Sequence, residues 1–207
     1  MMPRDDDSVT EQSQWARITQ EDPHHSANYV ARFRKLAAEG FDLGGEARLV
    51  DALLPRGARV LDAGCGPGRV GALLHAAGHS VVGVDGDPVL IAAAEADHPG
   101  PRWLVADLAE LDLAELDLAE EFDGIVCAGN VMAFLAPGTR REVLRRLRGS
   151  LADGGVAAIG FGAGRGYPFD EFLDDARSAG FTPDVLLSTW DLRPFTPASD
   201  FLVAVLR

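Results

Sequence analysis

Apolar stretches and polar or glycine-rich breaks alternate along the chain from residue 59 to about residue 180. Apolar runs rich in valine and isoleucine, with no polar alternation, predict strands that are buried on both faces, as in a parallel sheet covered by helices. Amphipathic runs that stop at glycine predict the helices between them. We expect strands at 58–64, 79–87, 102–108, 122–130 and 155–162, and helices at 70–78, 88–96, 138–155 and 170–180.

The last part of the chain breaks this rhythm. Two apolar segments, 184–192 and 200–207, are separated only by "RPFTPAS". So short a connection cannot hold a crossover helix, and the two strands should therefore be antiparallel. The fold class predicted is α/β: a Rossmann-like, doubly wound sheet of seven strands, mostly parallel with an antiparallel last strand, and with helices on both faces.

The pattern before the first strand is helical. Residues 21–54 predict one or two helices, in which Tyr29, Phe33 and Leu36 form one apolar face. We divide the chain into an acidic, flexible N-terminus (1–22), a helical lid or cap (23–55) and a core domain (56–207).

A five-residue unit is repeated three times in "DLAELDLAELDLAEE", residues 107–121. Five residues match neither the helical nor the strand period, so the repeat should build no apolar face and should only lengthen an acidic connection. Its first residue, Asp107, is different because it lies at the end of a predicted strand. Ligands of open α/β sheets bind at the carboxyl ends of the strands.

Composition narrows the classes of function. The chain has 207 residues, 47% of them hydrophobic and 25% charged, as in a globular domain. Its formal net charge of −13 argues against a nucleic-acid partner, which requires positive charge. No apolar run is long enough to span a membrane, and no secretory signal is evident, which predicts a cytoplasmic protein. Its two cysteines, Cys65 and Cys127, offer neither a disulfide framework nor a zinc spacing, so no metal site is expected.

The glycine-rich stretch "RVLDAGCGPGRVG", residues 59–71, matches two fingerprints. Gly66, Gly68 and Gly71 fit the G-x-G-x-x-G of NAD-binding and FAD-binding folds. Pro67 argues against that reading, because it removes a backbone N–H from a loop that would bind pyrophosphate through such donors. The antiparallel end of the sheet and the absence of a Tyr-x-x-x-Lys pair also argue against an NAD-dependent oxidoreductase.

Five segments in succession resemble the motifs of class I S-adenosylmethionine-dependent methyltransferases, in the order and at the spacing of that family. They are "VLDAGCGPGR" (60–69), "VVGVDGDPVLI" (81–91), "ADL" (106–108), "FDGIVCAGNVMAFL" (122–135) and "LRGSLADGGVAAIGFG" (147–162). The resemblance covers residues 40 to 207 and is closest to small bacterial methyltransferases, particularly through "GEAR", "AGNVMAFL" and "GFGAGRG".

The resemblance implies S-adenosyl-L-methionine as cofactor and assigns its contacts. In the family, the glycine loop wraps the methionine portion, Asp62 helps hold its ammonium, Asp85 accepts from the ribose hydroxyls, and Asp107 and the Leu108 N–H meet the adenine. The cofactor-binding residues that it implies are Asp62, Gly64, Gly66, Gly68, Asp85, Gly86, Asp107, Leu108, Ala128, Asn130 and Tyr29.

The resemblance also implies the reaction: methyl transfer by in-line displacement, driven mainly by proximity, to a small-molecule acceptor. His24, His25 and Asn130 are the candidates for a catalytic role, and the histidines could equally cap a helix in solvent. Trp190, in the last connection, could line an acceptor site or pack in the core. The chain is expected to be a monomer or a homodimer. A non-catalytic protein that binds the cofactor, or less readily an NAD-dependent oxidoreductase, is the alternative.

Overall fold

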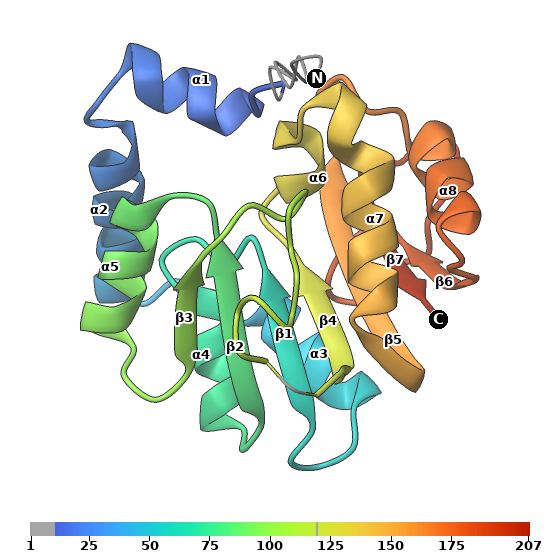
Figure 1. Ribbon diagram of the computed structural model, residues 1–207, viewed down its shortest axis with the longest axis horizontal. Helices are drawn as coiled ribbons and strands as arrows, with labels where there is room; N and C mark the ends of the chain where they lie inside the picture. The colour runs from blue at the N-terminus through green and yellow to red at the C-terminus, as the bar shows by residue number, and fades with distance from the viewer. Residues whose placement is uncertain (1–10, 119) are drawn as a thin grey trace, which may run out of the picture.

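One mixed sheet of seven strands organises the computed structural model, which describes residues 11–118 and 120–207 (Figure 1). The strand order is β3-β2-β1-β4-β5-β7-β6. Strands β1 to β5 are parallel, and β7 pairs antiparallel with both β5 and β6. The strands are Arg59–Ala63 (β1), Ser80–Asp85 (β2), Arg102–Val105 (β3), Phe122–Cys127 (β4), Leu151–Gly162 (β5), Pro183–Leu187 (β6) and Phe201–Leu206 (β7). The predicted fold class is confirmed, including the reversed end of the sheet.

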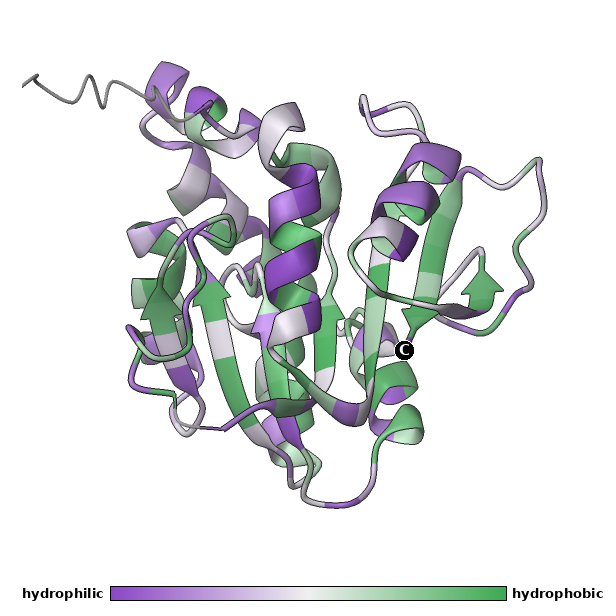
Figure 2. Cartoon of the chain, turned by 45° about the vertical axis from the view of Figure 1, so that its right-hand side comes forward, coloured by the Kyte–Doolittle hydropathy of each residue, from purple (hydrophilic) through white to green (hydrophobic). Residues whose placement is uncertain are grey.

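Helices cover both faces of the sheet. Alternate side chains of β1 enter two different apolar clusters: Leu61 packs on the face that carries α7 and α8, and Val60 on the face that carries α3 and α4. Figure 2 shows apolar strands enclosed by helices that turn polar sides outward. The helices are α1 (Gln14–Glu21), α2 (His25–Ala38), α3 (Gly45–Leu53), α4 (Arg69–Ala76), α5 (Pro88–Asp97), α6 (Val131–Phe134), the 3-10 helix η1 (Pro137–Thr139), α7 (Arg140–Gly149) and α8 (Phe169–Ser178).

Several predicted element boundaries were wrong. The helix expected at 138–155 ends at Gly149, where the Ser150 hydroxyl donates to the Arg146 carbonyl and closes the last turn. Strand β5 begins at once, with a register shift opposite Phe122 and Gly124 that accommodates the Gly154–Gly155 pair. The strand expected at 184–192 ends at Leu187, because the chain turns back and forms a bridge to Pro194.

Two helices were not predicted. Helix α1 lies within the segment 1–22 that we expected to be acidic and flexible, and residues 1–10 of that segment lie outside the described residues. Helix α6 directly follows β4. Figure 1 shows α1 crossing above the carboxyl ends of the strands, between α2 and α6.

The acidic repeat was predicted to build no apolar face, and this prediction was wrong. Leu108, Leu111 and Leu118 are buried in the main core, and Leu113 and Leu116 pack against it. Irregular backbone needs no fixed period to point leucines inward, so the segment covers the sheet without a helix.

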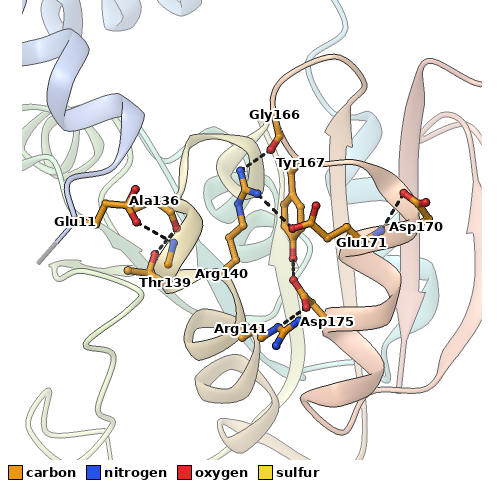
Figure 3. A network of polar contacts seen from close by, with 11 residues as sticks. Glu11, Ala136, Thr139, Arg140, Arg141, Gly166, Tyr167, Asp170, Glu171 and Asp175 are labelled. Carbon is orange, nitrogen blue, oxygen red and sulfur yellow. Dashed lines mark hydrogen bonds and ion pairs between the residues drawn. The ribbon is translucent and has the colours of Figure 1, made fainter.

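A polar network joins α7 to α8 beside the end of β5 (Figure 3). The buried Tyr167 hydroxyl donates to Asp175 at 2.9 Å, and the Arg141 Nε donates to the same carboxylate at 2.6 Å. Arg140 stacks over the Tyr167 ring and donates to the Gly166 carbonyl. These contacts hold the glycine-rich turn after β5 in place.

None of the helices in the described parts of the chain is both long and apolar enough to cross a lipid bilayer.

Candidate functional site

A cavity of about 620 Å³ lies at the carboxyl ends of strands β1 to β4, a volume typical of small-molecule sites. The turns that follow these strands form its floor, and residues of α1 and α2 form its roof. Nine of the predicted cofactor residues line it: Asp62, Gly64, Gly66, Asp85, Gly86, Asp107, Leu108, Ala128 and Tyr29. The topology thus brings together residues that are up to 99 positions apart, from Tyr29 to Ala128.

The glycine loop after β1 leaves space above its backbone. Gly66 has φ +54°, and a Cβ there would meet only the Tyr29 ring, 3.9 Å away. It would therefore project into the cavity. Gly64, at φ +75°, is constrained differently, because a Cβ would lie 2.4 Å from the Val131 side chain. Gly64 thus allows α6 to pack against the loop, and Gly66 keeps the cavity open.

Gly68 is not among the lining residues, although we predicted a cofactor contact for it. It precedes α4 at φ +83°, and a Cβ would lie 2.9 Å from both Ala94 and Trp103. Gly71, the third glycine of the dinucleotide fingerprint, is within α4, where a Cβ would lie 2.9 Å from Trp103. Both glycines allow close packing between α4, α5 and β3.

Asp62 is buried at the end of β1 and accepts the Gly71 N–H at 2.8 Å. Burial raises the pKa of its carboxyl to about 7, against the opposing effect of that hydrogen bond. A cationic group in the cavity would favour the ionised form. The buried carboxyl is thus suited to receive an ammonium.

Asp85 ends β2, and both of its oxygens accept backbone hydrogen bonds. Oδ2 accepts the Gly66 N–H at 2.9 Å, and Oδ1 accepts the Asp87 N–H at 2.9 Å. Burial raises the pKa of this carboxyl as well. Each carboxylate oxygen has a second lone pair, so Asp85 can still accept from a ligand diol.

The turn after β3 carries the predicted adenine contacts. Asp107 is exposed at the cavity and accepts the Ala109 N–H at 2.8 Å, which fixes the turn. Leu108 is buried and lines the cavity beside it. Gly86, after β2, also lines the cavity, and a Cβ there would meet only the Ala106 carbonyl oxygen, 3.9 Å away.

Asn130 lies outside the cavity lining, in contrast to the prediction. It adopts φ +67°, and its Oδ1 accepts the Gly162 N–H at 2.8 Å. The side chain thus joins the turn after β4 to the end of β5. Its neighbours Ala128 and Gly129 do line the cavity, and a Gly129 Cβ would lie 3.9 Å from the Tyr29 hydroxyl.

Tyr29 is the predicted lid residue that the structure places over the site. Its ring packs against Phe33 and Trp15, with centroids 4.9 Å and 5.3 Å away. Burial raises the pKa of its hydroxyl, which therefore stays protonated at neutral pH. With Phe134, these side chains form an aromatic wall of the cavity.

The two candidate histidines lie outside the cavity lining. His24 is exposed before the first turn of α2, and His25 packs edge-on against Trp15 at 5.0 Å. Both lie at the start of α2, where His24 makes no side-chain capping hydrogen bond and His25 is half-buried. Trp190 packs against Gly160 on β5 and lies outside the lining as well.

Sequence reasoning missed an ion pair at the cavity wall. Arg69, at the start of α4, donates to Glu46 through Nη1 and Nη2, at 2.8 Å and 2.6 Å. It also donates to the Leu43 carbonyl and lies over the Phe33 ring. Arg69 lines the cavity as a half-buried cation, and its Nε–H takes no part in these bonds. An arginine directly after a glycine loop was the available signal.

Comparisons with known proteins show the family of the chain. Residues 60–155 match the family described as a methyltransferase domain. The structure of a TehB-like SAM-dependent methyltransferase from Corynebacterium glutamicum is 49% identical in sequence, with a TM-score of 0.84 over 89% of this chain and 98% of that chain. Among proteins of curated function, none matches the sequence.

Two further structures are alike in fold alone. An S-adenosylmethionine-dependent methyltransferase from Clostridium acetobutylicum is 11% identical, with a TM-score of 0.73 over 87% of this chain and 98% of that chain. The 1,6-didemethyltoxoflavin-N1-methyltransferase of Burkholderia thailandensis, solved with 1,6-didemethyltoxoflavin and S-adenosylhomocysteine bound, is 23% identical, with a TM-score of 0.63 over 88% and 86%.

The fold and the cavity define a class I methyltransferase. The chain belongs to the S-adenosylmethionine-dependent methyltransferases, as its identity to the Corynebacterium protein over nearly the whole of both chains shows. Its cofactor is S-adenosyl-L-methionine. The dinucleotide interpretation of Gly66, Gly68 and Gly71 is therefore wrong.

Proposed function

We propose that the protein transfers the methyl group of S-adenosylmethionine to a small-molecule acceptor bound beneath α1 and α2. One observation carries this proposal. A single covered cavity contains the strand-end carboxylates Asp62, Asp85 and Asp107 and also the aromatic wall of Trp15, Tyr29 and Phe134. Cofactor and acceptor would share this space, which favours an acceptor of small size.

The residues present fit the cofactor. Asp85 would accept from the ribose hydroxyls, and Asp107 with the Leu108 N–H would receive the adenine. Asp62 would face the ammonium of the methionine portion. Arg69 is the one cationic side chain among the described lining residues, and we assign it to the carboxylate of that portion. The open space above Gly66 admits a ligand against the backbone.

When bound, the cofactor supplies a methyl group that is already activated on a sulfonium. The chain then has to position the acceptor in line and exclude water. The Gly129 backbone and the Tyr29 ring would bound the space where acceptor and methyl meet. Tyr29, protonated at neutral pH, would offer a hydroxyl donor there without adding charge.

The small size of the acceptor is supported by the Burkholderia structure, whose described ligand is a small molecule. The charge of −13 disfavours a nucleic-acid acceptor. The lid and core boundaries, a cytoplasmic location and a monomeric or homodimeric state remain predictions that accompany this proposal.

Methyl-labelled cofactor tests the proposal. The enzyme would be incubated with it and a cell extract, and label would be counted in the macromolecule-free filtrate, in protein and in nucleic acid. We expect label in the filtrate, and much less of it with the Asp85→Ala variant when the labelled cofactor is kept below saturation. Label in protein or nucleic acid would contradict a small acceptor. Cofactor binding with no transfer to any fraction would favour the non-catalytic alternative.

A further inference from the structure

The strongest contact between the roof and the floor of the cavity is made by Asp87, two residues after Asp85. Asp87 is buried, and its Oδ2 accepts the indole Nε1–H of Trp15 at 2.8 Å. The Ser26 hydroxyl of α2 donates to the same oxygen. One carboxylate oxygen at the end of β2 thus holds both roof helices.

The other polar atoms of Asp87 form hydrogen bonds with residues of the cavity floor. Its Oδ1 accepts the Val89 N–H at 2.8 Å and caps α5, while its backbone N–H donates to Asp85 Oδ1 at 2.9 Å. Asp87 is therefore bonded directly to the carboxylate that faces the ribose. A change in the position of Asp85 would be passed to the atom that holds the roof.

Helix α1 is held mainly through Trp15, which also packs against the apolar cluster of Val30, Leu90 and Ala93. None of its residues is buried. Trp15 makes edge contacts with His25, Tyr29 and Phe134, so it spans the cavity from α2 to α6. A second contact comes from Glu11, three residues before α1: its carboxylate accepts the Gly138 N–H at 2.9 Å at an exposed position (Figure 3). Because α1 buries so little, the Trp15–Asp87 bond has a large effect on whether it stays closed.

We propose that Asp87 is a positioning residue that latches α1 over the bound cofactor through Trp15 and links this latch to the ribose carboxylate Asp85. This inference rests on the cofactor placement proposed above. Closed, the latch keeps the aromatic wall against the site and excludes water; open, it releases the product cofactor. A hydrogen bond to a charged group is strong enough to decide between the two positions.

Two conservative variants test the latch. Trp15→Phe removes the indole N–H and keeps an aromatic ring. Asp87→Asn keeps an oxygen for the Val89 cap but turns a donor toward Trp15. Arg34→Gln is the matched control: Arg34 also joins α2 to α5, through Asp97 at 2.8 Å, but in an exposed ion pair outside the cavity lining.

The readouts need no acceptor. The first is the dissociation rate of S-adenosylhomocysteine, and the second is the rate at which trypsin cleaves after the exposed Arg17 of α1. We expect both rates to rise about tenfold in each variant, the cost of one hydrogen bond to a charged group. The double variant should be no faster than Asp87→Asn alone, since that variant already lacks the Trp15–Asp87 bond. Arg34→Gln should match the wild type.

Rates in Trp15→Phe that equal those of the wild type would overturn the latch, as would additive effects in the double variant. If Asp87→Asn fails to fold, Trp15→Phe alone decides. Failure of the proposed function is a separate result: a wild type that does not bind S-adenosylhomocysteine would refute the cofactor placement, while trypsin cleavage without ligand still tests the Trp15–Asp87 bond.

Discussion

The carboxylate of Asp85 accepts the N–H of Gly66 at 2.9 Å, so the end of β2 and the glycine loop after β1 share one hydrogen bond across the floor of the cavity. Two motifs that are separate in the sequence thus form one structural unit. The carboxylate that we propose for the ribose also fixes the loop that would wrap the methionine portion, so a change at either residue should affect both parts of the cofactor.

Replacing Asp85 with alanine should weaken cofactor binding by about 1–3 kcal/mol, the cost of leaving polar partners unmatched. The Gly66 and Asp87 N–H groups lose their acceptor in addition to the ribose. Calorimetry with S-adenosylhomocysteine measures the effect. A dissociation constant equal to that of the wild type would refute the ribose assignment.

Gly66→Ala should abolish or strongly reduce cofactor binding, because the new Cβ would project into the cavity below Tyr29. Gly78→Ala is its control, since Gly78 also has a positive φ, +98°, and open space around its Cβ, but lies at the end of α4 outside the lining. Both variants should lose stability by roughly 1–2 kcal/mol from backbone strain. Thermal unfolding and calorimetry separate the two effects. Equal binding by the two variants would show that Gly66 does not face the ligand.

Cofactor binding should weaken as the pH falls below about 7. Burial holds the pKa of Asp62 at about 7 in the free protein, and an ammonium binds the ionised carboxylate. At one pH unit below the pKa, about a tenth of the carboxyls are ionised, so the affinity should fall about tenfold per unit. Calorimetry between pH 5.5 and 7.5 measures this change in affinity. At the lowest pH values, binding of the cofactor should release a proton from Asp62.

Asp62→Asn provides the comparison for that pH profile. Its binding should be weaker than that of the wild type, and the part of the pH dependence that comes from Asp62 should be absent. A profile in Asp62→Asn as steep as that of the wild type would assign the titration to another group, such as Asp85, whose pKa burial also raises.

The parallel strands and the reversed end of the sheet could be predicted because buried parallel strands form uninterrupted apolar runs and short connections exclude crossovers. Element ends were less predictable where side chains decide them. Ser150 ends α7 four residues before the Gly154–Gly155 pair that was expected to do so. The leucines of the acidic repeat reach the core through an irregular backbone, which no periodicity could reveal.

The cavity lining was predictable where a motif residue lies at the end of a strand, as Asp62 and Asp85 do, or just beyond it, as Asp107 does. Gly68 could not be told from the other loop glycines by sequence, because close packing and close approach to a ligand both require the smallest residue. The role of Trp15 could not be predicted for another reason, because its hydrogen-bond partner Asp87 is 72 positions away in the sequence. Such a contact depends on the tertiary fold alone.

Arg69→Gln should weaken the binding of S-adenosylhomocysteine about tenfold or more and leave that of 5′-methylthioadenosine unchanged, since the second ligand lacks the amino-acid portion. The comparison of ligands within one variant separates a lost carboxylate contact from a general disturbance. The Glu46 carboxylate, left without its partner, should also lower stability. An equal loss for both ligands would exclude a specific contact between Arg69 and the carboxylate.

The central claim is that the cavity at the ends of β1 to β4 binds S-adenosylmethionine through Asp62, Asp85 and Asp107. Titration calorimetry of the full chain with S-adenosylhomocysteine and, separately, with NAD at pH 7.5 tests it most directly. We predict one-to-one binding of S-adenosylhomocysteine that Asp85→Ala weakens, and no binding of NAD. Binding of NAD alone, or binding of S-adenosylhomocysteine that Asp85→Ala leaves unchanged, would contradict it.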